Sequence, residues 1–243
     1  MATLIQRLGR SLRKRLYRAA GGGVREFRPG LYLASYGSDR DAAYARYRYE
    51  QEAANRRKLE RSWISEDHAA FLADAIAERL GDVRFGLCHG TRRGLEQTWL
   101  RERLPGEPEI VGTEIAESAD MFPHTVRWDF HDPNPDWEGR ADFVYSNSWD
   151  HAFDPEKAFR VWAGQLRSDG LMLLDHSETH APRTEKAGAN FTDPFSAEGP
   201  ALAGFLNEVC ADFGEVTETL AAPRRADETD CTVIIFKRRA GDG

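Results

Sequence analysis

The sequence is poor in cysteine and has no long apolar run. Cys88, Cys210 and Cys231 are widely spaced and odd in number, which suits neither a disulfide framework nor a zinc site with paired ligands. No stretch reaches the roughly 18 consecutive apolar residues of a membrane-spanning helix, and no apolar secretory core opens the chain. These absences predict a cytoplasmic protein with free thiols and no metal site.

Basic residues are scarce in the body of the chain and concentrated at its start. Of the 33 lysines and arginines, six lie before residue 20 with no acid among them, so the remainder carries a formal charge of about −13. A negative body repels nucleic-acid phosphates. We therefore expect no nucleic-acid partner.

Residues 1–20 predict a basic amphipathic helix. Leucine recurs every four residues at Leu4, Leu8, Leu12 and Leu16, which gives one apolar stripe among arginines. Such a helix is suited to peripheral contact with an anionic membrane or an acidic partner. The alternatives are a helix packed on the domain, a solvated tail and an organelle transit peptide, which is also rich in arginine and poor in acids, although few serines are present here.

Residues 21–80 predict a helical extension. The three glycines at 21–23 indicate a flexible joint. Residues 39–61 are charged and compatible with a helix, and Ser65 is a good N-cap for a second helix that ends at Gly81.

Residues 81–243 alternate short apolar runs with helical stretches, which is typical of βαβ units and a mainly parallel sheet. The last two strands are joined by a polar loop without a helix, so we expect them to pair antiparallel at one edge. The predicted strands are 83–88, 109–113, 125–128, 141–146, 171–175, 216–220 and 232–237.

The loop from Gly86 to Gly94 follows the first predicted strand and precedes a helix. Glycines allow a sharp turn and close backbone approach to a ligand, and helix N-terminal amides favour a negative group. Doubly wound sheets bind ligands at the carboxyl ends of their strands. The candidate cofactor-binding residues of this loop are His89, Gly90, Thr91, Arg92 and Gly94.

Acidic residues end the next two strands. Glu114, followed by Ile115, lies where a carboxylate can accept both hydroxyl protons of a ribose, or could instead cap the following helix. Asp129 could accept from an adenine amino group, and Phe130 could cover the ring. These residues predict an adenosine-containing cofactor.

From Val83 to Lys237 the sequence resembles class I S-adenosylmethionine-dependent methyltransferases. Residues 142–147 are similar to the family's fourth strand, and residues 166–173 to the turn before its fifth. The resemblance implies an α/β fold: a doubly wound, seven-stranded, mainly parallel sheet of order 3-2-1-4-5-7-6, its last strand antiparallel, with an N-terminal helical extension. It also implies S-adenosylmethionine as cofactor, contacted by Asn147.

The glycine turn of the family is only partly kept, because two arginines stand at residues 92 and 93. Arg92 or Arg93 could bind the cofactor's methionine carboxylate, or could face water. We divide the chain into the tail (1–20), an extension covering the cofactor site (21–80) and the Rossmann-like methyltransferase domain (81–243).

Methyl transfer to a hydroxyl needs positioned reactants and a proton acceptor. Asp150 and His151 after the fourth strand, and His176 after the fifth, are the candidate catalytic residues. His176 and His180 would share a face and bind zinc only if that segment were helical, and it follows a strand directly. The polar stretch 178–199 predicts a lid or acceptor wall.

The predicted function is methylation, expected to be O-methylation, of a small molecule, a sugar or a lipid-linked glycan. One alternative is a cofactor- or partner-binding module without turnover. A second is an NAD-dependent oxidoreductase.

Overall fold

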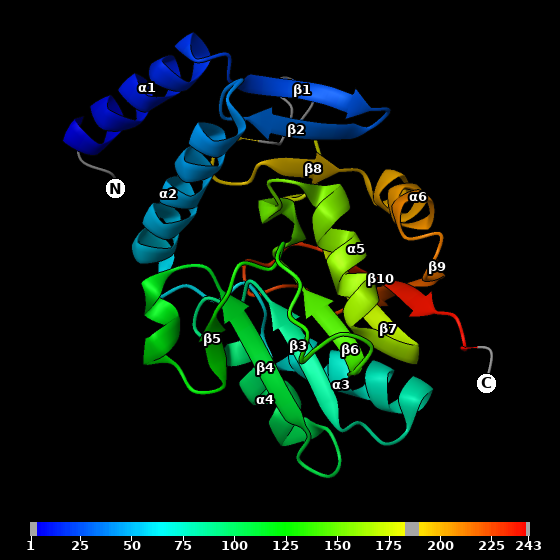
Figure 1. Cartoon of the computed structure of the whole chain (residues 1–243). Coiled ribbons are helices and arrows are strands. Elements are labelled where there is room, and N and C mark those ends of the chain that lie inside the picture. Colours follow the sequence, from blue (N-terminus) through cyan, green and yellow to red (C-terminus); the bar gives the residue numbers. More distant parts are fainter. Residues whose placement is uncertain (1–3, 183–189, 242–243) are drawn as a thin grey trace.

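Helices cover both faces of a seven-stranded sheet in the computed structural model, which describes residues 4–182 and 190–241 (Figure 1). Its strands are β3 (Phe85–His89), β4 (Glu109–Glu114), β5 (Thr125–Arg127), β6 (Ala141–Ser146), β7 (Leu166–Ser177), β9 (Gly214–Ala222) and β10 (Cys231–Arg238). They lie in the order β5-β4-β3-β6-β7-β10-β9. Among these seven strands, β10 runs opposite to the other six. The predicted order 3-2-1-4-5-7-6 is confirmed.

The two faces of this sheet have separate cores. Its helical segments are α3 (Glu66–Leu80), α4 (Leu95–Arg103), η1 (Glu117–Met121), η2 (Trp149–His151), α5 (Pro155–Gln165) and α6 (Gly199–Val209). Along β7, Met172 and Leu174 share a buried cluster with Trp162 of α5, whereas Leu173 packs in a second cluster with Leu72 of α3. Alternate side chains of a strand point to opposite faces, so both faces are apolar and both are covered.

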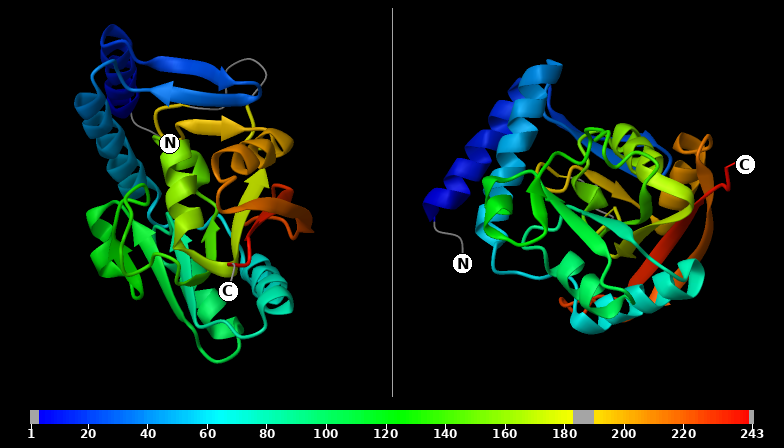
Figure 2. Two further views of the ribbon diagram at one scale, coloured as in Figure 1. Left: turned by 45° about the vertical axis from the view of Figure 1, so that its right-hand side comes forward. Right: turned by 60° about the horizontal axis from the view of Figure 1, so that its bottom comes forward.

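The remaining elements form a layer beyond the carboxyl ends of the parallel strands. They are α1 (Leu4–Ala19), β1 (Gly23–Arg28), β2 (Leu31–Ser35), α2 (Arg40–Lys58) and β8 (Phe195–Ala197). The three strands make a small antiparallel sheet of order β1-β2-β8, and α1 lies beside α2 (Figures 1 and 2).

The sequence predicted a helical extension over residues 21–80. This prediction is wrong in part, because β1 and β2 lie within that range. Gly30 adopts a φ of 73° in the turn of the β1–β2 hairpin, and its amide donates to Glu26 at 2.8 Å. On its other edge β2 pairs with β8, in which Phe195 lies opposite Leu33. A strand partner so distant in sequence leaves no local signal, which is why these strands were missed.

The three glycines form a tight turn and not a flexible joint. The amide of Gly22 donates to the Tyr17 carbonyl at 2.7 Å. A Cβ on Gly22 would lie 2.7 Å from the carbonyl oxygens of both Tyr17 and Ser35. Only glycine permits this close contact between α1 and β2.

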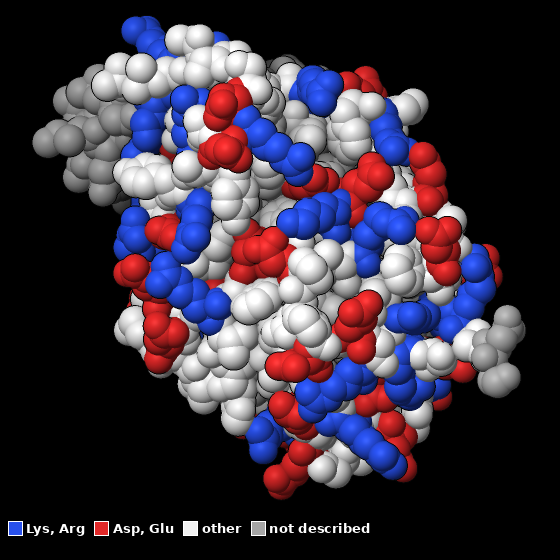
Figure 3. All heavy atoms as spheres, viewed as in Figure 1, with Lys and Arg blue, Asp and Glu red and all other residues white. Residues whose placement is uncertain are grey.

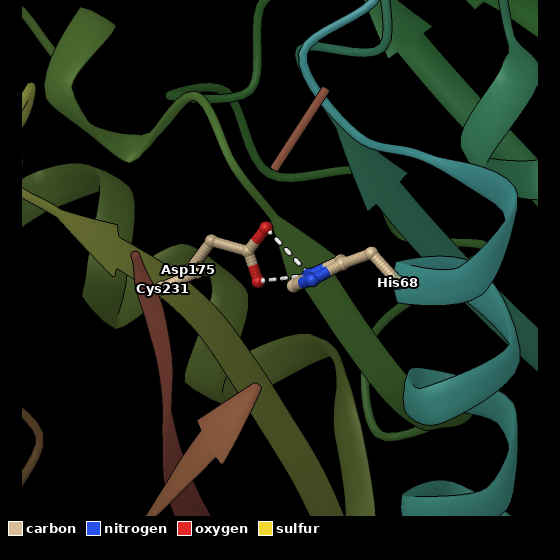
Figure 4. A group of neighbouring side chains, drawn as sticks. All are labelled: His68, Asp175 and Cys231. Carbon is tan, nitrogen blue, oxygen red and sulfur yellow. Dashed lines mark hydrogen bonds and ion pairs between the residues drawn. The ribbon is translucent and has the colours of Figure 1, made fainter. Parts of the chain in front are cut away.

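A buried charged pair joins α3 to the centre of the sheet (Figure 4). His68 Nε2 lies 2.9–3.0 Å from both carboxylate oxygens of Asp175, and His68 Nδ1 lies 3.2 Å from the Pro223 carbonyl. Both ring nitrogens thus face acceptors, so both contacts are hydrogen bonds only when the imidazole is protonated. Tyr145 donates to the same carboxylate at 2.8 Å.

Loss of this pair is expected to destabilise the fold strongly. His68→Ala would leave the Asp175 carboxylate buried without its counter-charge, which costs about 3–5 kcal/mol. Urea titration measures the free energy of unfolding. Asp74→Ala, at an exposed position on the same helix, is the control and should change it by less than about 0.5 kcal/mol.

The pair also predicts a pH dependence. Burial lowers the pKa of His68, but the attraction and hydrogen bond from Asp175 outweigh it, and the pKa is raised above its ordinary value. The stabilisation is complete below the unfolded pKa of about 6.5 and is lost as pH rises through the raised folded pKa. The double variant His68→Gln, Asp175→Asn should lose less stability between about pH 6 and 9; equal losses would contradict a charged His68.

Candidate functional site

Two adjoining cavities lie where the parallel strands end. The main cleft encloses about 530 Å³, and the side cavity about 600 Å³; both are partly open to solvent. They share Lys58, Ser148 and His151. The other residues of the main cleft are Tyr47, Gln51, Ala54, Asn55, Gly90, Arg92, Thr113, Glu114, Ile115, Asp129 and Phe130.

The loop after β3 enters the main cleft at Gly90. Gly90 has a φ of 78°, and a Cβ there would lie 2.7 Å from Ser148 Cβ. The amides of Gly90 and Thr91 both donate to the Thr113 carbonyl, at 2.9 and 3.1 Å. The glycine is therefore required by the close packing of the loop on the chain after β6.

Arg92 is the cation of this loop that lines the main cleft. It lines the main cleft and the small recess beside it, which Thr91 and Arg93 also line. Burial lowers the pKa of Arg92, and Glu114 and Glu96 oppose that shift. Its Nη1 donates to the Arg61 carbonyl at 3.2 Å. The head group of Arg92 can therefore reach a ligand in either space.

Glu114, at the end of β4, lines the main cleft beside Ile115. Its carboxylate accepts from the Ala116 amide at 2.9 Å, at the start of η1. Burial raises the pKa of Glu114, against the opposing effects of that amide and Arg92. Glu114 therefore both contacts the start of η1 and lines the main cleft.

Asp129 and Phe130 follow β5 and also line the main cleft. Asp129 accepts from the ring Nδ1 of His131 at 2.6 Å and from the hydroxyl of Tyr44, which reaches it from α2. Burial opposes ionisation of Asp129, but the contacts with His131 and Tyr44 outweigh it and lower its pKa to about 2. A charged acceptor therefore lies beside an aromatic ring.

His89 and Gly94 lie behind the cleft wall. His89 is 1% exposed; its Nδ1 lies 2.9 Å from Thr113 Oγ1 and its Nε2 lies 2.8 Å from Gln165 Oε1. A Cβ on Gly94 would lie 2.6 Å from Gln97 Nε2. Both residues shape the loop from behind, and neither lines a cavity among the described residues.

Asn147 lines both the recess and the side cavity. Its Nδ2 lies 3.3 Å from Glu96 Oε1, and its Oδ1 accepts from the Ser148 hydroxyl at 2.9 Å. Burial raises the pKa of Glu96 to about 7. Asn147 therefore connects α4, the helix after the glycine loop, to the side cavity.

Three proton-accepting atoms meet in the side cavity. His151 Nε2 lies 3.8 Å from Asp150 Oδ1 and 3.6 Å from Asp193 Oδ1. Burial opposes ionisation of Asp193, but His151 and Lys58 outweigh it and its pKa is lowered; burial, with Asp193, raises the pKa of Asp150 well above its ordinary range. The η2 turn after β6 positions Asp150 and His151, and the segment before β8 supplies Asp193.

Gln51 of α2 fixes the orientation of the His151 ring. Gln51 Nε2 donates to the Thr192 carbonyl at 3.0 Å, which leaves Oε1 to accept from His151 Nδ1 at 2.7 Å. The Nδ1 nitrogen therefore carries a proton. Burial also lowers the pKa of His151, so the ring is neutral at neutral pH and its Nε2 lone pair faces Asp150 and Asp193.

His176 is separated from this group. It stacks on Trp149, with 6.1 Å between ring centroids, and its Nε2 donates to the Ala197 carbonyl at 2.9 Å. The described residues that line the main cleft and the side cavity do not include it. The structure thus brings Asp150 and His151 together and leaves His176 under β8.

No protein-family model and no curated protein matches this sequence. Solved structures do match. The 1,6-didemethyltoxoflavin-N1-methyltransferase of Burkholderia thailandensis, bound to 1,6-didemethyltoxoflavin and S-adenosylhomocysteine, has a TM-score of 0.63 and 15% identity over 89% of this chain and 99% of its own. The N-methyltransferase NodS of Bradyrhizobium japonicum WM9, bound to S-adenosylhomocysteine, has a TM-score of 0.55 and 11% identity over 78% and 98%.

In this chain β10 lies antiparallel between β7 and β9. The chain has the class I S-adenosylmethionine-dependent methyltransferase fold. The [4+2]-cyclase SpnF is also similar, with a TM-score of 0.56 and 13% identity over 79% of this chain and 94% of its own. The methyltransferase fold is therefore shared with a protein named for a different reaction.

Two groups of described side chains bring three potential metal-ligand atoms within 4.8 Å of one another. In the first, His68 and Asp175 are already hydrogen-bonded, and burial raises the pKa of Cys231, so its thiol stays protonated. In the second, Asp150, His151 and Asp193, the Lys58 ammonium lies 3.9 Å from Asp193 and supplies positive charge.

Several site residues carry no sequence signal. Gln51 and Lys58 lie on a helix that is charged all round, where a pocket-facing side chain cannot be told from a solvated one. Asp193 and Arg225 lie in polar loops. Tyr44 and Tyr47 are tyrosines among the arginines of residues 39–61, a pattern that also fits a role in packing alone.

The Gln51 contact predicts the tautomer of His151. Gln51→Leu removes the acceptor for Nδ1–H, so the neutral ring should shift towards the form protonated on Nε2. Nitrogen-15 chemical shifts of the ring at neutral pH measure this change. Glu52→Leu, the next residue on α2, is the control and should leave the shifts unchanged; an unaltered ring in Gln51→Leu would contradict the assignment.

Proposed function

We propose that the chain is an S-adenosylmethionine-dependent methyltransferase that binds its cofactor in the main cleft and its acceptor in the side cavity. The observation that carries this proposal is that Glu114 and Asp129 end adjacent parallel strands and line one cleft. Ligands of such sheets bind at the carboxyl ends of the strands. Two neighbouring structures contain S-adenosylhomocysteine, the cofactor after methyl transfer.

Each proposed cofactor contact follows from the chemistry of a cleft residue. Glu114 accepts the ribose hydroxyl protons, Asp129 accepts from the adenine amino group, and Phe130 covers the ring. Arg92 pairs with the methionine carboxylate. Gly90 and Ile115 complete the wall of the main cleft, Thr91 and Asn147 contact the cofactor from the adjoining recess, and His89 and Gly94 act from behind the wall. Residues 21–80 cover the site through α2.

The proposed reaction is O-methylation by in-line displacement. Bound S-adenosylmethionine would supply the methyl group and would keep the electron pair of its carbon–sulfur bond, so that the acceptor oxygen would take the methyl. The hydroxyl proton passes to the Nε2 lone pair of His151. The imidazolium so formed faces the Asp193 carboxylate at 3.6 Å, which favours the proton transfer. Asp150 completes this polar surface; His176 acts only through packing.

The acceptor class proposed is a small molecule, a sugar or a lipid-linked glycan, in that order. Acidic and basic side chains are interspersed on the face in Figure 3, and the body of the chain is negatively charged. Neither feature favours nucleic acid. The alternatives are a cofactor-binding module without turnover and an NAD-dependent oxidoreductase.

Calorimetric titration tests the cofactor assignment. We expect heat of binding with S-adenosylmethionine and S-adenosylhomocysteine, and none with NAD. Arg92→Ala should weaken S-adenosylhomocysteine about tenfold or more, since a charged hydrogen bond is worth roughly 1.5–3 kcal/mol. Arg93→Ala is the matched control, because Arg93 pairs with Glu60 at 3.6 Å and lies outside the main cleft. Binding of NAD alone would refute the proposal.

We also propose that α1 touches an anionic membrane surface. Arg13 and Tyr17 anchor the helix to Glu50 of α2, at 3.3 and 3.0 Å. Leu12 and Leu16 point outward and are 60% and 58% exposed. Within the described residues, every helix is too short or too polar to cross a bilayer. An exposed apolar stripe among arginines suits the interface of a bilayer with anionic lipids.

Co-sedimentation with phosphatidylserine vesicles tests this contact. The full chain should sediment, and Leu12→Gln with Leu16→Gln should reduce the bound fraction at least fivefold, because the apolar stripe is lost. The control is Val126→Gln, at an exposed apolar residue of β5. Leu202→Gln is unsuitable as a control because Leu202 lies in the core. Equal sedimentation of all three proteins would exclude the membrane role of α1.

A further inference from the structure

Three cations surround the indole ring of Trp63. The Lys58 ammonium lies 5.6 Å from the ring centroid, and the guanidinium carbons of Arg92 and Arg225 each lie 5.9 Å from it. Trp63, Lys58 and Arg225 line the side cavity, whereas Arg92 lines the main cleft and the recess. Lys58 and Arg225 are therefore the cations within reach of an acceptor.

Arg225 is a buried cation to which no carboxylate of residues 4–182 or 190–241 is hydrogen-bonded. The residue is 5% exposed, and its Nε is buried without a hydrogen bond among the described residues. The carboxylate that pairs with it, Asp227, has Oδ1 at 3.8 Å from Nε, which exceeds hydrogen-bonding length. The guanidinium charge is thus poorly compensated.

The side chains within hydrogen-bonding distance of the Arg225 guanidinium, among the described residues, are neutral. Its Nη1 donates to the Ser177 hydroxyl at 3.1 Å and lies 3.2 Å from His180 Nε2. The Ser177 amide donates to His180 Nδ1, and His180 Nε2 contacts the Asn147 carbonyl, so the proton of the neutral ring lies on Nε2. Burial and Arg225 hold the pKa of His180 well below its ordinary value.

Lys58 is also incompletely paired. Its Nζ lies 3.9 Å from Asp193 Oδ1, an atom that His151 Nε2 shares at 3.6 Å. Its side chain is 26% exposed. Burying a cation without a close counter-ion is costly, and an anion that enters the side cavity would recover part of that cost.

We propose that the side cavity recognises an anionic group of the acceptor, a carboxylate or a phosphate, through Arg225 and Lys58. A guanidinium presents a planar fork that fits two oxygens of either group, and Lys58 adds a point charge. This inference rests on the proposed function for the identity of the ligand as the methyl acceptor. The anion site itself rests only on the residues of the cavity.

The acceptor would then have two distinct ends. Its hydroxyl group lies against His151 and Asp150, and its acidic group lies against Arg225 and Lys58. Hydroxy acids and phosphorylated sugars have both groups. Neutral sugars and uncharged aromatic molecules lack the second, and the cavity would select against them because Arg225 would stay without a counter-ion.

Titration of the full chain with inorganic phosphate, and separately with malonate, tests the site. S-adenosylhomocysteine at saturation keeps the anions out of the main cleft. We expect about one site, with affinity reduced at least tenfold in Arg225→Gln. Arg224→Gln is the matched control, because Arg224 is adjacent, exposed and paired with Asp230; its affinity should stay within twofold. Equal losses in both variants, or no binding by the wild type, would overturn the proposal.

If Arg225→Gln fails to fold, Lys58→Gln tests the site instead, because Lys58 is less buried. We expect its affinity for the anion to fall at least threefold. An unchanged affinity would count against the proposal. The two proposals fail separately. If S-adenosylhomocysteine does not bind, the cofactor assignment fails, and the anion titration is repeated in Arg92→Ala protein. Anion binding that still depends on Arg225 there would uphold the site.

Discussion

The packing of α2 across the carboxyl ends of the parallel strands determines both cavities. Tyr47 is buried in a cluster with Tyr36 and Phe153, which fixes the helix against the loop after β6. From that anchor, Tyr44 reaches Asp129 and Gln51 reaches His151. Without α2 the sheet would present the same strand ends, but Asp129 would lose its contact with Tyr44, His151 would lose its contact with Gln51, and the main cleft would lose one of its walls.

The parts of the fold set by local patterns could be predicted from the sequence. Short apolar runs between helical stretches predicted the strands of the seven-stranded sheet, and the polar loop before β10 predicted its antiparallel pairing. The β1-β2-β8 sheet could not be predicted, because its register depends on Leu33 meeting Phe195 from a distant segment. The short loops after the strands also placed Glu114 and Asp129 in one cleft.

The chemistry of the side cavity was less predictable, for a physical reason. His151 and His176 each follow a strand predicted from the sequence, but His151 faces a cavity, whereas His176 lies within β7 and packs under β8. The difference depends on tertiary partners, the Gln51 amide for one and the Ala197 carbonyl for the other. Arg225 could not be predicted, because the sequence of a polar loop does not show which of its charged side chains is buried.

The small sheet also imposes an order on synthesis. The β1–β2 hairpin leaves the ribosome about 160 residues before β8, its third strand, and at about 5–20 residues per second that interval lasts roughly 10–30 seconds. An isolated hairpin is marginally stable in water. The first two strands of the small sheet therefore wait for β8 while β3 to β7 are made, and β8 leaves the ribosome before β9 and β10, which complete the seven-stranded sheet.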